Sequence, residues 1–191
     1  MNAAMKEFAQ KGFKNASTDE IVKEAAISKG ALFHYFHNKK DMFFFLYDYA
    51  LDVVMNEILL KFNYDEKDFF ERLRQGSLLK FKIWRKHPQM FDFIVNAYIE
   101  ELGEVKGELE KRNMGLIANS QGLLYEGIDN CKFKEGVDIK RAIEIIVWTM
   151  EGFTNKELKR LKILSLNEQN YSELLKESDI YLEMLKKSFY K

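Results

Sequence analysis

The sequence predicts an all-α protein of about nine helices, with a small three-helix head followed by a larger helical body. Of its 191 residues, one is proline and ten are glycine, so few positions interrupt a helix. Apolar residues recur at helical spacing, and side-chain caps precede several of the runs. We expect the head to occupy residues 1–46 and the body residues 47–191, joined by one long helix without a flexible linker.

The first helix of the head is expected over residues 2–11. Ala4 and Phe8 lie on one face of it. Gly12 stands where a helix C-terminal glycine belongs, because glycine adopts a left-handed backbone conformation at little steric cost. Phe13 can then fold back onto the core of the head.

Two short capped helices follow in series. Ser17 and Glu20 form a capping box that opens the second helix of the head. After a tight turn at residues 26–27, Ser28 caps a third helix that ends near Phe36. A helix, a tight turn and a second capped helix are the layout of a helix-turn-helix motif.

Polar breaks divide the body into six further helices. Asn38 and Asp41 start the first of these, Asp65 is expected to cap the next, and His87-Pro88 separates that one from its successor. Asp138 is expected to cap a helix that is apolar on nearly every side. The expected ranges are residues 38–62, 65–86, 88–101, 103–129, 138–153 with a possible extension to 161, and 171–189.

Composition excludes several protein classes. No stretch approaches 18 uninterrupted apolar residues, so we expect no transmembrane helix and no membrane partner. The single cysteine, Cys131, cannot form an internal disulfide, and no secretory signal is visible, so we expect a cytoplasmic protein. No phosphate-binding loop or catalytic triad pattern is present, and His34 with His37 lacks further ligands, so no catalytic residue, cofactor or metal is predicted.

Charge limits how the protein can bind nucleic acid. The chain carries 30 basic and 30 acidic residues, and the head holds seven lysines against five acids. Bulk charge of this kind does not hold a protein on DNA. Any DNA binding must therefore depend on the placement of a few groups, present in two copies.

Four motifs in the head carry a family resemblance. They are Phe8-Ala9-Gln10-Lys11-Gly12-Phe13, Ser17-Thr18-Asp19-Glu20-Ile21, Ser28-Lys29-Gly30-Ala31-Leu32-Phe33-His34-Tyr35-Phe36 and Lys39-Lys40-Asp41. In residue type and spacing, the segment from Met5 to Leu46 resembles the DNA-binding domain of the TetR (tetracycline repressor-like) family of bacterial regulators. Phe33 departs from the family, which usually has a tyrosine there with a hydroxyl that often meets a phosphate.

The resemblance implies which residues bind double-stranded DNA. The third helix would enter the major groove, where its first turn and outward side chains meet base edges and phosphates. Thr18 and Lys39 would bind phosphates from the starts of the second and fourth helices. The other residues expected at the DNA are Ser28, Lys29, Gly30, Ala31, His34 and Tyr35. The alternative is a short core helix with aromatic side chains packed on all sides.

The resemblance also implies that the body encloses a pocket for a small-molecule inducer. Such pockets are mainly apolar with a few placed polar groups. Residues expected to line it are Trp84, Phe91, Asn96, Tyr98, Gln121, Tyr125 and Trp148. Ordinary core packing is the alternative for each of them.

The apolar eighth helix indicates a partner copy. A helix of this kind must be covered on all sides, and pairing the last two helices with their copies would form a two-fold interface. The sequence thus predicts a homodimeric, ligand-responsive regulator, a repressor, on a pseudo-palindromic operator. The alternatives are a helical small-molecule-binding protein or an enzyme without DNA binding, and a helical adaptor that binds protein.

Overall fold

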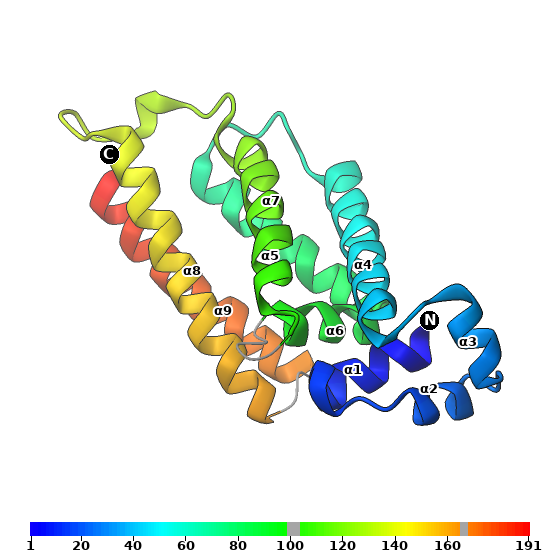
Figure 1. The fold of residues 1–191 in the computed structure, drawn as a ribbon. Coiled ribbons are helices and arrows are strands. Elements are labelled where there is room, and N and C mark those ends of the chain that lie inside the picture. Colours follow the sequence, from blue (N-terminus) through cyan, green and yellow to red (C-terminus); the bar gives the residue numbers. More distant parts are fainter. Residues whose placement is uncertain (99–103, 165–167) are drawn as a thin grey trace. The chain divides into compact units, whose positions relative to one another are not determined.

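Nine α-helices and one short 3-10 turn make up the regular structure of the described residues (Figure 1). The computed structural model describes residues 1–98, 104–164 and 168–191, and only the backbone of residues 115–123, 161–164 and 168–169. The predicted all-α class is confirmed. The elements are α1 (Asn2–Asn15), α2 (Thr18–Glu24), α3 (Lys29–Tyr35), α4 (Lys39–Lys61), α5 (Phe69–Lys86), α6 (Pro88–Tyr98), α7 (Lys106–Tyr125), η1 (Asn130–Lys132), α8 (Ile139–Leu164) and α9 (Glu168–Phe189).

Side-chain caps begin several helices where the sequence places them. The Oδ1 atom of Asn38 accepts a hydrogen bond from the Asp41 N–H at 2.9 Å, at the start of α4. Asp138 accepts from the Arg141 N–H at 3.1 Å, at the start of α8. Pro88 occupies the first position of α6, where its missing N–H leaves no helical hydrogen bond unmade.

The predicted start of α5 is wrong by four residues. Asp65 is exposed and lies before the helix, whereas Asp68 caps it. The Oδ1 atom of Asp68 accepts from the N–H groups of Phe70 at 2.9 Å and Glu71 at 3.3 Å. Burial decides between the two aspartates, because Asp68 is enclosed beside two buried phenylalanines and Asp65 is not.

Other boundaries differ by a few residues. α7 ends at Tyr125 rather than near 129, because Gly127 has a φ of 74° and breaks the helical path. α8 continues to Leu164, beyond the expected end at 153 or 161, and α9 begins at Glu168 rather than 171. The expected end of α6 at 101 and start of α7 at 103 lie outside the described residues.

Contacts between residues divide the chain into two compact units. The first unit comprises residues 1–60 and 82–116, and the second comprises residues 61–81 and 117–191. α5 contributes to both units. The head of residues 1–46 falls inside the first unit, and the division at 46/47 stays a prediction.

The first unit is built on an aromatic core shared by α1, α4 and α6. Phe43 of α4 lies with its ring centroid 5.0 Å from that of Phe8 on α1 and 5.3 Å from that of Phe93 on α6, both in edge-on geometry. All three side chains are fully buried. Edge-on aromatic pairs add to the burial of apolar area, so this cluster holds the head on the start of the long α4 helix.

The second unit closes around the C-terminal end of α9. Tyr190 lies 4.8 Å from the ring centroids of both Phe70 and Phe133, and its hydroxyl accepts from the Phe69 N–H at 3.2 Å. Burial raises the pKa of Tyr190 to about 12. No described helix is both long and apolar enough to cross a membrane.

Candidate nucleic-acid interface

The turn between α1 and α2 depends on Gly12. Its backbone has a φ of 69°, which breaks the helical path inside α1, as the sequence predicted for this glycine. Phe13 follows and is buried, with its ring centroid 5.2 Å from that of Phe43. The kink therefore turns the chain so that Phe13 enters the core of the first unit and α2 can begin.

A buried carboxylate holds the start of α2. The Oε1 atom of Glu7 accepts from the Ser17 N–H at 2.9 Å and from the Lys11 ammonium at 3.0 Å. Burial raises the pKa of Glu7, but these two donors outweigh it and the net pKa is lowered. Ser17 in turn accepts from the Glu20 N–H at 3.4 Å, which confirms it as the cap of α2.

The helix-turn-helix motif is completed by α3. Ala26, in the turn, has a φ of 54°, a left-handed conformation in which the chain reverses tightly. Ser28 accepts from the Ala31 N–H at 3.0 Å and caps α3 as predicted. Leu32 is the buried residue of α3 and attaches the helix to the core of the first unit.

The remaining faces of α3 are open. The predicted DNA-facing residues of this helix and its cap are all exposed, and Tyr35 is 81% exposed. The rings of His34 and Tyr35 lie edge-on at 5.6 Å, so the two side chains form one aromatic edge at the end of the helix. The exposed set is Ser28, Lys29, Gly30, Ala31, His34 and Tyr35.

Nothing within the chain requires a glycine at position 30. A Cβ atom there would meet nothing nearer than the Ser28 Oγ atom at 3.9 Å, which is ordinary contact. Its backbone is helical, so an L-residue would not be strained. A need for glycine at this position would therefore come from something outside the chain that approaches the backbone.

Three further groups surround the open face of α3. The Lys29 ammonium lies 2.7 Å from Asp19 of α2, and both side chains are exposed, so the pair is readily exchanged for another partner. Thr18 is half-buried at the start of α2. Lys39 donates to the carbonyls of Lys14 and Ala16, each at 3.1 Å, so its ammonium is engaged with the end of α1.

The predicted inducer-binding residues do not gather at one described cavity. Trp84, Phe91, Asn96 and Tyr98 belong to the first unit, and Tyr125 and Trp148 to the second. Trp84 is buried and donates to the Asp92 carboxylate at 3.4 Å, whereas Trp148 is 64% exposed. The side chain of Gln121 lies outside the described residues. This set stays a prediction.

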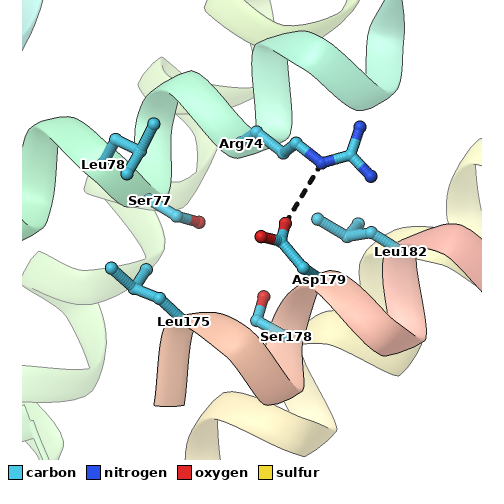
Figure 2. Close-up of a pocket in the computed structure, with 7 residues that line it drawn as sticks. All are labelled: Arg74, Ser77, Leu78, Leu175, Ser178, Asp179 and Leu182. Carbon is cyan, nitrogen blue, oxygen red and sulfur yellow. Dashed lines mark hydrogen bonds and ion pairs between the residues drawn. The ribbon is translucent and has the colours of Figure 1, made fainter. Parts of the chain in front are cut away.

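Figure 2 shows a small cavity between α5 and α9 within the second unit. Its volume is about 50 Å³, enough for a few water molecules and far below what a drug-sized ligand occupies. Arg74 donates to Asp179 at 3.1 Å and closes one side of it. The lining residues are Arg74, Ser77, Leu78, Leu175, Ser178, Asp179 and Leu182, none of which is among the residues expected to line the inducer pocket.

Sequence reasoning missed two structural carboxylates. Glu7 braces α2 from ten residues away, and no local pattern signals that contact. Asp68 carried a signal, since Glu71 follows it by three residues in the spacing of a capping box. Among the described residues, no group of three His, Cys, Asp or Glu is arranged to hold a metal ion.

Residues 1–45 match the family described as bacterial regulatory proteins, tetR family. The chain is 25% identical over 192 residues to the fatty acid metabolism regulator protein of Bacillus subtilis (strain 168), over 97% of this chain and 91% of that protein. The exposed α3 therefore lies in the part of the chain that is similar to bacterial regulatory proteins of the tetR family.

Two solved structures have a similar fold. The fatty acid degradation regulator FadR from Bacillus halodurans superposes with a TM-score of 0.70 at 19% identity, covering 95% of each chain. The regulator FadR from Bacillus subtilis, in complex with stearoyl-CoA, superposes with a TM-score of 0.67 at 20% identity, covering 96% of this chain and 94% of that one.

Proposed function

We propose that the chain is a DNA-binding transcriptional regulator of the TetR family, and that it acts as a ligand-responsive repressor that binds a pseudo-palindromic operator as a homodimer. The observation that carries this proposal is the exposed, cap-anchored α3, whose free side includes a basic group, an aromatic edge and a bare backbone position. These are groups that meet phosphates and base edges in a major groove. Thr18 and the remaining N–H of the Lys39 ammonium supply phosphate contacts beside it.

The dimer interface is proposed on the last two helices. Ile145 and Trp148 of α8 and Ile180 and Met184 of α9 are large apolar side chains that are exposed in the single chain. Exposed apolar side chains of this size, on two helices that contact each other, favour association with a second copy. Two copies would present two α3 helices to successive major grooves, as a palindromic operator requires.

The ligand is proposed to be a molecule with a long fatty acyl chain. The support is the likeness along almost the whole chain to a regulator of fatty acid metabolism, and the stearoyl-CoA bound to one structural neighbour. The ligand would favour a conformation in which the two α3 helices are mis-spaced for DNA. Ligand and operator would then oppose each other through one coupling free energy, about 1–3 kcal/mol in such systems.

The protein is proposed to act in the cytoplasm, without a cofactor and without catalysis. The enzyme alternative predicts turnover of a substrate and no affinity for duplex DNA. The support for the regulator is the open face of α3, which Ser28 caps, in a segment similar to bacterial regulatory proteins of the tetR family. A protein-binding adaptor would bind its partner with a weak dependence on salt.

A fluorescence-anisotropy titration of the DNA upstream of the protein's own gene tests the proposal. We expect specific binding whose logarithmic affinity falls linearly with the logarithm of salt, with a slope of several units, because phosphate contacts release counterions. Addition of palmitoyl-CoA should release the DNA. Binding that does not depend on salt would contradict the phosphate contacts, and a complex that palmitoyl-CoA leaves intact would contradict the ligand class.

A further inference from the structure

One lysine lies on the inward face of α5. Phe69, Arg72 and Leu79 are buried on this face. At about 100° per residue, Lys80 lies roughly 20° around the helix from Phe69, and Gly76 lies roughly 20° from it on the other side. A lysine in this row is unexpected, because an ammonium is costly to bury unless something pairs with it.

Open space adjoins this lysine. The side chain of Lys80 is exposed although it stands in a buried row, and a Cβ atom on Gly76, one turn earlier, would meet nothing within 4 Å. Two neighbouring positions on the inward face thus border on empty space. Burial among the surrounding protein also lowers the pKa of Lys80. An accessible side chain that stands in a row of buried ones lines a recess rather than a convex surface.

The two cations of this face are treated differently. The Arg72 guanidinium donates to the carbonyls of Tyr64, Glu66 and Glu126 at 3.1, 2.5 and 2.6 Å, so the chain satisfies it. No hydrogen bond or ion pair within the described part of the chain reaches the Lys80 ammonium. The fold therefore uses the Arg72 guanidinium in its own structure and leaves the Lys80 ammonium available to a ligand.

We propose that Lys80 anchors the anionic head of the ligand, with the apolar chain of that ligand lying along the inward face of α5. The inference rests on the proposed function and names the chemistry of its site. Leu73, which is partly exposed and lies roughly 20° around the helix from Lys80, provides an apolar contact for the chain. An anion is the complement of an unpaired ammonium, and it is either the carboxylate of a fatty acid or a phosphate of its CoA thioester.

Three probes with the same acyl or alkyl chain length distinguish a carboxylate from a phosphate as the anion. Palmitate offers a carboxylate, palmitoyl-CoA offers phosphates, and 1-hexadecanol offers the chain without charge. Each is titrated by calorimetry into the full-length protein, into Lys80→Met, which keeps the length of the side chain, and into Lys80→Arg, which keeps the charge. Lys82→Met is the matched control, since Lys82 is an exposed lysine two residues away on the opposite side of α5.

We expect Lys80→Met to weaken the binding of an anionic probe by about tenfold or more, because a charge-assisted bond is lost. Binding of 1-hexadecanol should change by less than about twofold, Lys80→Arg should restore the anionic probe, and Lys82→Met should bind like the wild type. A loss with palmitate alone identifies a carboxylate, and a loss with palmitoyl-CoA alone identifies a phosphate.

Unaltered binding of both anionic probes by Lys80→Met overturns the anchor and leaves the ligand class standing. A wild-type protein that binds operator DNA but none of the three probes overturns the ligand class, and the anchor with it. Thermal melting guards against a folding defect. We expect the melting temperature of unliganded Lys80→Met to equal or exceed that of the wild type, because the substitution removes a charge that no group in the described part of the chain pairs with. A lower melting temperature, with all three probes weakened alike, would assign Lys80 a structural role instead.

Discussion

The Lys39 ammonium donates a hydrogen bond to the backbone carbonyl of Ala16 at 3.1 Å, from the first residue of α4 to the chain that leaves α1. A second bond, to the Lys14 carbonyl, has the same length, and the ammonium lies 4.8 Å from the centroid of the Phe13 ring. Lys39 thus fastens the end of α1 to the start of α4. Any phosphate contact it makes comes in addition to this structural role.

The first prediction concerns Lys39→Met. Loss of the two bonds should lower the free energy of unfolding by roughly 1–2 kcal/mol and weaken operator binding as well. Urea denaturation and DNA titration measure the two effects. Lys40→Met is the control, since Lys40 is exposed on the same helix turn, and it should leave stability within about 0.5 kcal/mol. A stable Lys39→Met variant would contradict the fastening role.

Substitution of Tyr35 should change operator affinity without changing the stability of the fold. Because its side chain is 81% exposed and its ring lies edge-on to that of His34, Tyr35→Ala should weaken operator affinity by about tenfold and leave the melting temperature within a degree or two. Leu60→Ala removes an equally exposed side chain, 85%, from α4 and should affect neither property. Wild-type affinity in Tyr35→Ala would remove Tyr35 from the interface.

Gly30→Ala should change stability and binding in opposite directions. The new methyl group meets no close neighbour, and alanine favours the helix over glycine by up to about 1 kcal/mol, so the melting temperature should rise. The same methyl group should weaken operator binding if DNA approaches this backbone closely. Circular dichroism melts and anisotropy titrations give the two readings. A variant that is more stable and binds equally well would show that nothing approaches Gly30.

Asp68 should control stability in acid. Burial raises the pKa of Asp68, but the hydrogen bond from Lys132 at 2.8 Å and the N–H of Glu71 outweigh it, so the pKa is lowered from 3.8. The group then stabilises the fold fully above pH 3.8, and this contribution is lost as the pH falls through the lower, folded value.

Asp68→Asn should therefore cost about 2–3 kcal/mol at pH 7, because it removes a charge that a lysine and the α5 cap both use. The difference from wild type should shrink as the pH falls from 4 towards 2. Urea denaturation at a series of pH values measures it. Asp65→Asn, three residues earlier and exposed, is the matched control and should alter stability little at any pH. A difference that stays constant down to pH 2 would rule out the ionic contribution.

Trp148→Glu should convert a dimer into monomers. Trp148 is 64% exposed on α8, and a charge in an interface that buries this position would be left without solvent. Sedimentation velocity should show the loss of the dimer, and operator affinity should fall with it. Met114→Glu, on α7 and 62% exposed, should leave the assembly unchanged. If Trp148→Glu remained dimeric like the wild type, the interface would lie elsewhere.

The sequence predicted the helix-turn-helix motif almost residue by residue because its signals are local. Ser17, Ser28 and Asn38 each accept a hydrogen bond from the backbone N–H three residues ahead, and this geometry is complete within one helical turn. Gly12 is also a local signal, because its positive φ depends on the residue itself and not on distant segments. Local pattern failed at Asp65 and Asp68, where both could serve as a cap and burial chose between them.

By itself, then, the sequence determined the helix order and the caps, and the family resemblance of the head implied the outward placement of the polar and aromatic groups of α3. Tertiary structure alone decided which charges have partners. Glu7 reaches Ser17, Lys39 reaches Ala16 and Lys132 reaches Asp68 over separations of 10, 23 and 64 residues. The physical reason is that a cap needs only its own helical turn, whereas the energy of an ion depends on the burial and the donors that distant segments bring to it.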